Sequence, residues 1–134
     1  MGRFLLPLAA LLLIAPLGAA AAQEPEWRQS ADFDVLLKPY AFEPETLQLE
    51  AGRPVRLRFV NSGQATLTFS APGFFRAARV RSGADSEAVE GGTIRLAPGE
   101  RRTIVLVPAR GRYKMRSANF IHRLLGMSGR IVVE

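Results

Sequence analysis

The sequence contains no cysteine and only one histidine, His122, among its 134 residues. Without cysteine the protein has no disulfide bond, no thiolate ligand for a metal, no thiol nucleophile and no cysteine for lipid attachment. The fold must therefore be held together by a packed apolar core. Imidazole chemistry is limited to the single position of His122.

The sequence also has no apolar run long enough for a comfortable membrane span, which needs about 20 residues. Arg3 precedes an apolar run over residues 4–17, and small residues follow up to Ala22. This order predicts a secretory signal peptide over 1–22, cleaved after Ala22, and therefore a periplasmic protein without a stable membrane span after cleavage. An uncleaved anchor is the alternative. The polar residues 23–31 predict a flexible arm, and residues 32–134 have the size of one domain.

Positive charge exceeds negative charge, with 18 Lys and Arg against 12 Asp and Glu and a formal net charge of +6. Most of the arginines alternate with apolar residues, as in Val55-Arg-Leu-Arg-Phe59, which predicts that they lie on the solvent faces of strands. The basic balance fits a solvated surface, an acidic protein partner or anionic lipid. Nucleic acid is not indicated, because no recognition motif is present.

Alternation of apolar and polar residues recurs along the chain, and Gly or Pro turns separate the alternating segments. This pattern predicts an all-β sandwich of about seven or eight strands with Greek-key connections. Residues 74–80 are expected to form one or two helical turns. Residues 81–92 are expected to form an exposed loop whose acidic side chains are solvated. The alternating segments are 33–37, 44–50, 54–60, 65–70, 93–96, 101–107, 113–117 and 131–133.

The C-terminal stretch carries the most specific motif. Ser117, His122 and Met127 are spaced five residues apart, and Gly129-Arg-Ile-Val-Val133 follows them. This stretch resembles the copper loop of the cupredoxins, in which Cys-x4-His-x4-Met precedes Gly-x-Ile-Val-Val. Ser117 stands at the position of the cysteine.

The resemblance extends to the front half of the domain. The run from Phe42 to Asn61 is similar to the cupredoxin segment that leads into a strand ending in Asn. Shortly after it the family has a His-x-Phe element, and this chain has Leu67-Thr-Phe69. The likeness covers residues 33–134.

The resemblance implies a degenerate type 1 copper site, with Leu67 and Ser117 at two ligand positions. Type 1 copper needs two imidazoles and a thiolate, with a weak axial thioether. We therefore expect no type 1 copper, with Leu67 filling the vacated space as part of the core. We also expect no enzymatic activity, because Ser117 and His122 lack a Gly-x-Ser-x-Gly elbow.

Two functions remain open at this stage. The first is a non-catalytic binding or accessory module with no cofactor, which acts through a periplasmic protein partner. In the cupredoxins the histidine of this loop lies near the surface on which redox partners dock. Phe120 and Ile121 would form the apolar centre of such a surface, and Arg116 and Arg123 its basic rim. The sequence does not decide whether Phe120 and Ile121 point outward or pack inward.

The second function is binding or transfer of a metal. His122 and Met127, with Met115, would make a soft His/Met₂ set that suits Cu(I) in a site other than type 1. A resemblance to the cupredoxin-like domain of periplasmic iron-uptake proteins also raises iron, although no carboxylate lies near His122 in the sequence. Both methionines fit an ordinary apolar core equally well.

Overall fold

The computed structural model describes residue 2 and residues 24–134. The predicted signal peptide therefore lies almost entirely outside the described residues. The described part forms two five-stranded sheets, sheet A in the order β2-β1-β4-β8-β6 and sheet B in the order β3-β10-β9-β5-β7. No helix in this part of the chain is long and apolar enough to cross a membrane.

The elements follow the predicted alternation closely. Sheet A contains β1 (Ala31–Lys38), β2 (Ala41–Glu43), β4 (Val55–Asn61), β6 (Arg79–Val80) and β8 (Arg101–Val107). Sheet B contains β3 (Thr46–Leu49), β5 (Leu67–Ser70), β7 (Thr93–Leu96), β9 (Gly111–Arg116) and β10 (Ser128–Val133). The helices are α1 (Pro72–Ala77), α2 (Ala84–Ala88) and α3 (Phe120–Leu124), with 3₁₀ turns at Trp27–Gln29 and Glu90–Gly92.

The predicted all-β sandwich is confirmed, with ten strands rather than seven or eight. The additional strands include β2 and β6, which have only three and two residues. Segments this short contain too few residues to show an alternation, so their pairing is visible only in the folded chain.

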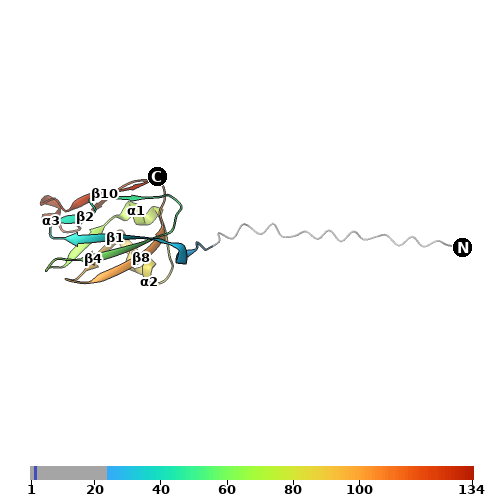
Figure 1. Cartoon of the computed structure of the whole chain (residues 1–134), viewed down its shortest axis with the longest axis horizontal. Helices are drawn as coiled ribbons and strands as arrows, with labels where there is room; N and C mark the ends of the chain where they lie inside the picture. The colour runs from blue at the N-terminus through green and yellow to red at the C-terminus, as the bar shows by residue number, and fades with distance from the viewer. Residues whose placement is uncertain (1, 3–23) are drawn as a thin grey trace.

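Two parallel pairings join segments that are distant in the sequence. In sheet A, β1 lies parallel to β4, and in sheet B, β3 lies parallel to β10. Figure 1 shows α3 beside β2 at one end of the sandwich, while the C-terminus that follows β10 lies towards the other end. The loop between β9 and β10 is therefore presented at the end of the molecule, beyond the two sheets.

The core fills the space between the sheets with the inward-facing side chains of each strand. Phe59 of β4 and Phe69 of β5 are fully buried, and their rings lie 4.8 Å apart across the two sheets. Phe42 of β2 packs edge-on against Phe69 with a centroid distance of 5.4 Å. Burial of such apolar side chains is the main stabilising contribution in a chain without disulfides.

Residues 81–92 differ from the expected exposed loop, since they form α2 and a 3₁₀ turn. The Asp85 side chain, expected to be solvated, is only 7% exposed. Its Oδ2 accepts hydrogen bonds from the Val105 N–H at 3.1 Å and from Arg81 Nε at 2.9 Å. The carboxylate supplies the acceptor for a backbone donor of β8, and this requirement keeps it buried.

The segment before β1 contains one 3₁₀ turn. The Trp27 indole N–H donates to Glu24 at 3.2 Å, and Arg79 of β6 forms an ion pair with the same carboxylate at 3.4 Å. Regular pairing begins at Ala31, opposite Val55 and one residue before the predicted start of the domain.

Candidate functional site

The loop between β9 and β10 is held at its base by backbone hydrogen bonds. The Ser117 N–H donates to the Met127 carbonyl at 3.1 Å, and the Met127 N–H donates to the His122 carbonyl at 3.0 Å. Asn119 caps α3, because its Oδ1 accepts from the backbone N–H groups of Ile121 at 2.9 Å and His122 at 3.3 Å. The cap and the closed base fix the position of His122 relative to the sandwich.

Ser117 lies immediately after β9 and is fully buried. Its hydroxyl shares a hydrogen bond of 3.1 Å with the Thr68 hydroxyl of β5 and accepts one from the Asn119 N–H at 3.1 Å. Thr68 Oγ1 also accepts from the Ala118 N–H at 2.8 Å. The Ser117 hydroxyl therefore joins the loop to β5, and within the described residues no hydrogen bond connects it to His122.

His122 is half-buried in α3, and its ring lies edge-on to Tyr40 with a centroid distance of 5.6 Å. Its Nδ1 is buried and has no hydrogen-bond partner within the described part of the chain. A buried polar atom without a partner costs about 1–3 kcal/mol. The hydrogen-bonding or ligating capacity of Nδ1 is therefore unused among the described residues.

The two methionines of the predicted metal set are both fully buried and belong to the apolar core. Met115 packs closely against Gly129 of β10. A Cβ at position 129 would come within 2.5 Å of Met115 Cε and 2.3 Å of the Glu45 carbonyl oxygen, so only glycine fits there. The structure thus gives a packing reason for the glycine of the closing Gly-x-Ile-Val-Val motif.

Leu67 points into the core from β5 and is 2% exposed. The turn before it is fixed by Asn61, a fully buried polar residue at the end of β4. The Asn61 amide donates to the carbonyls of Ala65 at 2.8 Å and Leu96 at 3.0 Å, and its Oδ1 accepts from the Gly63 N–H at 2.8 Å. The sequence marks residues 61–63 as a turn but does not reveal this network, which depends on a carbonyl 35 residues away.

Phe120 and Ile121 point outward, with 63% and 62% of their surfaces exposed. The alternative that they pack inward is therefore wrong. Three further apolar residues of this region were not identified from the sequence. Together the five form the α3 apolar patch, which consists of Tyr40, Phe120, Ile121, Leu124 and Leu125.

The two arginines expected at the rim of this surface differ in environment. Arg116 is exposed at the end of β9, whereas Arg123 is half-buried in α3. The Arg123 guanidinium carbon lies 5.8 Å from the centroid of the Phe120 ring, and its Nε is buried without a partner in the described residues. Arg123 therefore places a positive charge, whose Nε lacks a hydrogen-bond partner among the described residues, directly beside the α3 apolar patch.

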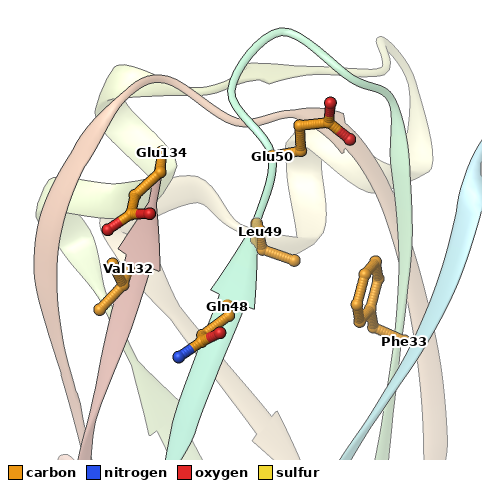
Figure 2. A pocket seen from close by; sticks show the side chains of 6 residues that line it. All are labelled: Phe33, Gln48, Leu49, Glu50, Val132 and Glu134. Atoms are coloured by element: carbon orange, nitrogen blue, oxygen red, sulfur yellow. The ribbon is translucent and has the colours of Figure 1, made fainter.

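A hollow of about 360 Å³ lies at the strand ends shown in Figure 2 and is lined by residues of β1, β3 and β10 and by the residues that follow β3 and β10. Leu49 points toward Phe33 across it, while the Glu50 and Glu134 side chains lie at the ends of β3 and β10. Within residues 24–134 no three His, Cys, Asp or Glu side chains gather as a group that could hold a metal. We assign no chemistry to this hollow.

Comparisons with known proteins extend the resemblance to structure. No family model and no curated protein matches this chain. Among solved structures, the reduced auracyanin of Roseiflexus castenholzii superposes with a TM-score of 0.56 at 20% identity, covering 78% of this chain and 98% of its own. Auracyanin A, a blue copper protein from Chloroflexus aurantiacus, gives 0.54 at 19% identity over 78% and 99%.

A third neighbour is a multicopper oxidase from Campylobacter jejuni. It superposes with a TM-score of 0.59 at 11% identity, covering 85% of this chain but only 31% of the oxidase. The chain therefore has a cupredoxin-like fold. At these identities the likeness concerns the fold and does not extend to function.

Proposed function

We propose that the chain is an exported periplasmic accessory module that carries no type 1 copper and acts by binding a partner protein through the α3 apolar patch. The observation that carries this proposal is the exposure of Phe120 and Ile121 on a loop whose base is fixed. Exposed apolar groups with an arginine beside them are typical of the centre of a protein interface.

The ligand chemistry supports the absence of type 1 copper. The alkyl side chain of Leu67 donates no electron pair, and a serine hydroxyl is a poor substitute for a thiolate. The Ser117 hydroxyl is moreover engaged by Thr68 and the Asn119 N–H. The residues at these positions do not fit the type 1 ligand set.

The proposed absence of type 1 copper is tested by restoring the missing imidazole and thiolate ligands. We expect the double variant Leu67→His, Ser117→Cys to develop an intense blue absorption with Cu(II), because it would supply the missing imidazole and thiolate. The unmodified mature chain should show no such band. A blue copper complex of the unmodified chain would contradict the proposal.

Partner binding is tested by placing a benzoylphenylalanine photo-crosslinker at Ile121 in intact cells. We expect a discrete adduct in the periplasmic fraction. A crosslinker at Thr103, an exposed position of β8 in sheet A, is the control and should give none. Identical adducts from both positions, or none from Ile121, would contradict docking through the α3 apolar patch.

Metal handling is the second candidate, and the buried, unpartnered Nδ1 of His122 is the observation that favours it. His122 with Met127 and Met115 would offer one imidazole and two thioethers, a soft set suited to Cu(I). Iron is less favoured, because carboxylate ligands do not gather in residues 24–134.

Calorimetric titration with Cu(I) separates the two candidates. Metal handling predicts stoichiometric binding that His122→Ala abolishes, with the chain still folded. The accessory module predicts no such binding and a crosslink at Ile121 that persists in His122→Ala.

A further inference from the structure

Within its strands, the outward-facing side chains of sheet B include positive charges and no carboxylate, and Glu50 and Glu134 lie just beyond the ends of β3 and β10. Arg112, Lys114 and Arg116 alternate along β9, Arg130 lies on β10, and Arg95 lies on β7. The remaining outward positions hold Thr, Ser, Gln and Val. We call these five residues the cationic face: Arg95, Arg112, Lys114, Arg116 and Arg130, all exposed.

The charges of the cationic face are not neutralised within the protein. No ion pair of the described residues involves any of the five. Lys114 and Arg130 stand directly opposite each other across the β9–β10 ladder. Like charges in directly opposed positions repel and destabilise a sheet. A bound anion would remove this repulsion.

The cationic face also contains a concave site next to α3. A hollow of about 370 Å³ is lined by Lys114, Arg116 and Arg130 together with Arg123. Met115, Ser128 and Gly129 complete its lining, which contains no acidic residue. The Nε of Arg123 is buried here without a partner, and a guanidinium donor of this kind suits the two oxygens of a carboxylate.

From this arrangement we propose that the cationic face binds an extended, carboxylate-rich segment of the partner protein, with one carboxylate in the hollow beside Arg123. The proposal rests on the proposed function, because it names the chemistry of the partner that the α3 apolar patch meets. Arg and Lys on adjacent strands would contact successive carboxylates as the segment follows β9 and β10.

The geometry favours a protein segment over a membrane or a nucleic acid. Helix α3, which carries most of the apolar patch, lies at the end of the sandwich (Figure 1), whereas the five residues of the cationic face lie on β7, β9 and β10 of sheet B. A flat lipid surface would meet one of these surfaces at a time, whereas a protein segment can pass around the corner where Arg123 lies. The outward positions of sheet B carry no aromatic side chain on which a base could stack.

The test measures binding of the mature chain to labelled poly-L-glutamate at low and at physiological ionic strength. We expect saturable binding that the double variant Lys114→Gln, Arg130→Gln weakens about tenfold. The control Arg56→Gln, Arg58→Gln removes the same two charges from sheet A and should weaken binding by less than about twofold, because Asp32 and Asp34 already pair with these arginines.

Equal weakening in the two double variants would overturn the proposal, because binding would then follow net charge alone. Absence of saturable binding would also overturn it. A third arm uses vesicles of phosphatidylglycerol in phosphatidylcholine. Vesicle binding that the Lys114→Gln, Arg130→Gln variant abolishes, without binding of poly-L-glutamate, would replace the protein segment with a lipid surface.

The two proposals fail separately. Absence of poly-L-glutamate binding together with a crosslink at Ile121 would contradict the proposal for the cationic face and would still support docking through the α3 apolar patch. Binding of poly-L-glutamate without a crosslink at Ile121 would contradict docking through the α3 apolar patch and would still support binding of carboxylates by the cationic face.

Discussion

The outer faces of both sheets carry cations. In sheet A carboxylates stand opposite two of them, whereas in sheet B two cations stand opposite each other. In sheet A, Asp32 stands opposite Arg56 and Asp34 opposite Arg58 across the parallel β1–β4 ladder, with ion pairs of 3.0 and 2.7 Å. The pKa of Arg58 is raised because its side chain hydrogen-bonds to Asp34 and senses the negative charge of that carboxylate.

In sheet B the corresponding position opposite Lys114 holds another cation, Arg130. Both faces are solvent-exposed sheet surfaces of one domain, so solubility alone does not explain why cross-strand ion pairs form on only one of them. The comparison teaches that the charge of each outer face follows from the residues at its outward strand positions, which include Asp32 and Asp34 in sheet A and no carboxylate in the strands of sheet B. The first face forms ion pairs between neighbouring strands, whereas the five residues of the cationic face form none with the described residues.

The largest loss of stability is expected for a substitution of Asp85, the buried carboxylate that is bonded to β8 of sheet A. Asp85→Ala should lower the free energy of unfolding by about 2 kcal/mol, because the buried Val105 N–H loses its acceptor. Urea denaturation measures this. Glu87→Ala, an exposed acid of the same helix, should change the free energy by less than about 0.5 kcal/mol. Equal effects of both substitutions would show that Asp85 acts only through surface charge.

In sheet B the corresponding buried polar link uses hydroxyls. Ser117→Ala should lower the free energy of unfolding by about 1 kcal/mol, since the Asn119 N–H and the Thr68 hydroxyl each lose a partner. The control is Ser86→Ala, which removes an exposed hydroxyl bonded to a carbonyl of its own turn. Denaturation curves that superpose for Ser117→Ala and the unmodified chain would contradict a structural role for this hydroxyl.

Exchanging the charge pattern of the two faces should have smaller effects of opposite sign. Lys114→Glu should stabilise the chain by about 0.5 kcal/mol, because it places a carboxylate opposite Arg130. Asp32→Lys should destabilise it by a similar amount, because it places two cations opposite each other. Thermal unfolding of both variants at low ionic strength measures the pair. A loss of stability in Lys114→Glu would refute repulsion on the cationic face.

The smallest expected effect is the change with salt concentration in the stability difference between Lys114→Gln and the unmodified chain. At low ionic strength Lys114→Gln should be slightly more stable than the unmodified chain, because one repulsive charge is gone. The gap should shrink by about 0.3 kcal/mol at high salt, since exposed charges are screened over distances of about 10 Å or less. Unfolding followed across a salt series measures the gap, and a gap that widens with salt would exclude a Coulombic origin.

Alternation in the sequence was sufficient to predict the sandwich and most of its core, because inward residues of strands repeat with a period of two. It did not predict the pairing of Lys114 with Arg130 or of Asp32 with Arg56. Cross-strand partners depend on register, and a one-residue shift places every side chain on the other face. Which charges stand opposite one another in each sheet is therefore a tertiary property.

The candidate site was predicted only in part, because spacing in the sequence locates a loop but does not give its tertiary contacts. The spacing of Ser117, His122 and Met127 located the loop, and the structure places Ser117 and Met127 in direct backbone contact. The outward direction of Phe120 could not be read from the sequence, since a five-residue helix is too short to show an apolar stripe. Burial of Asp85 likewise depends on a backbone donor twenty positions away.

The pairing of β3 with β10 has a consequence for the order of folding. β3 is an edge strand whose only neighbour in sheet B is β10, which contains the last strand residues of the chain. Residues 46–49 therefore wait for their partner until residues 128–133 have been synthesised. Contacts so far apart in sequence slow folding. Sheet B therefore cannot be completed on a nascent chain before residues 128–133 have been added, and its edge strand β3 is among the last strands to gain its partner.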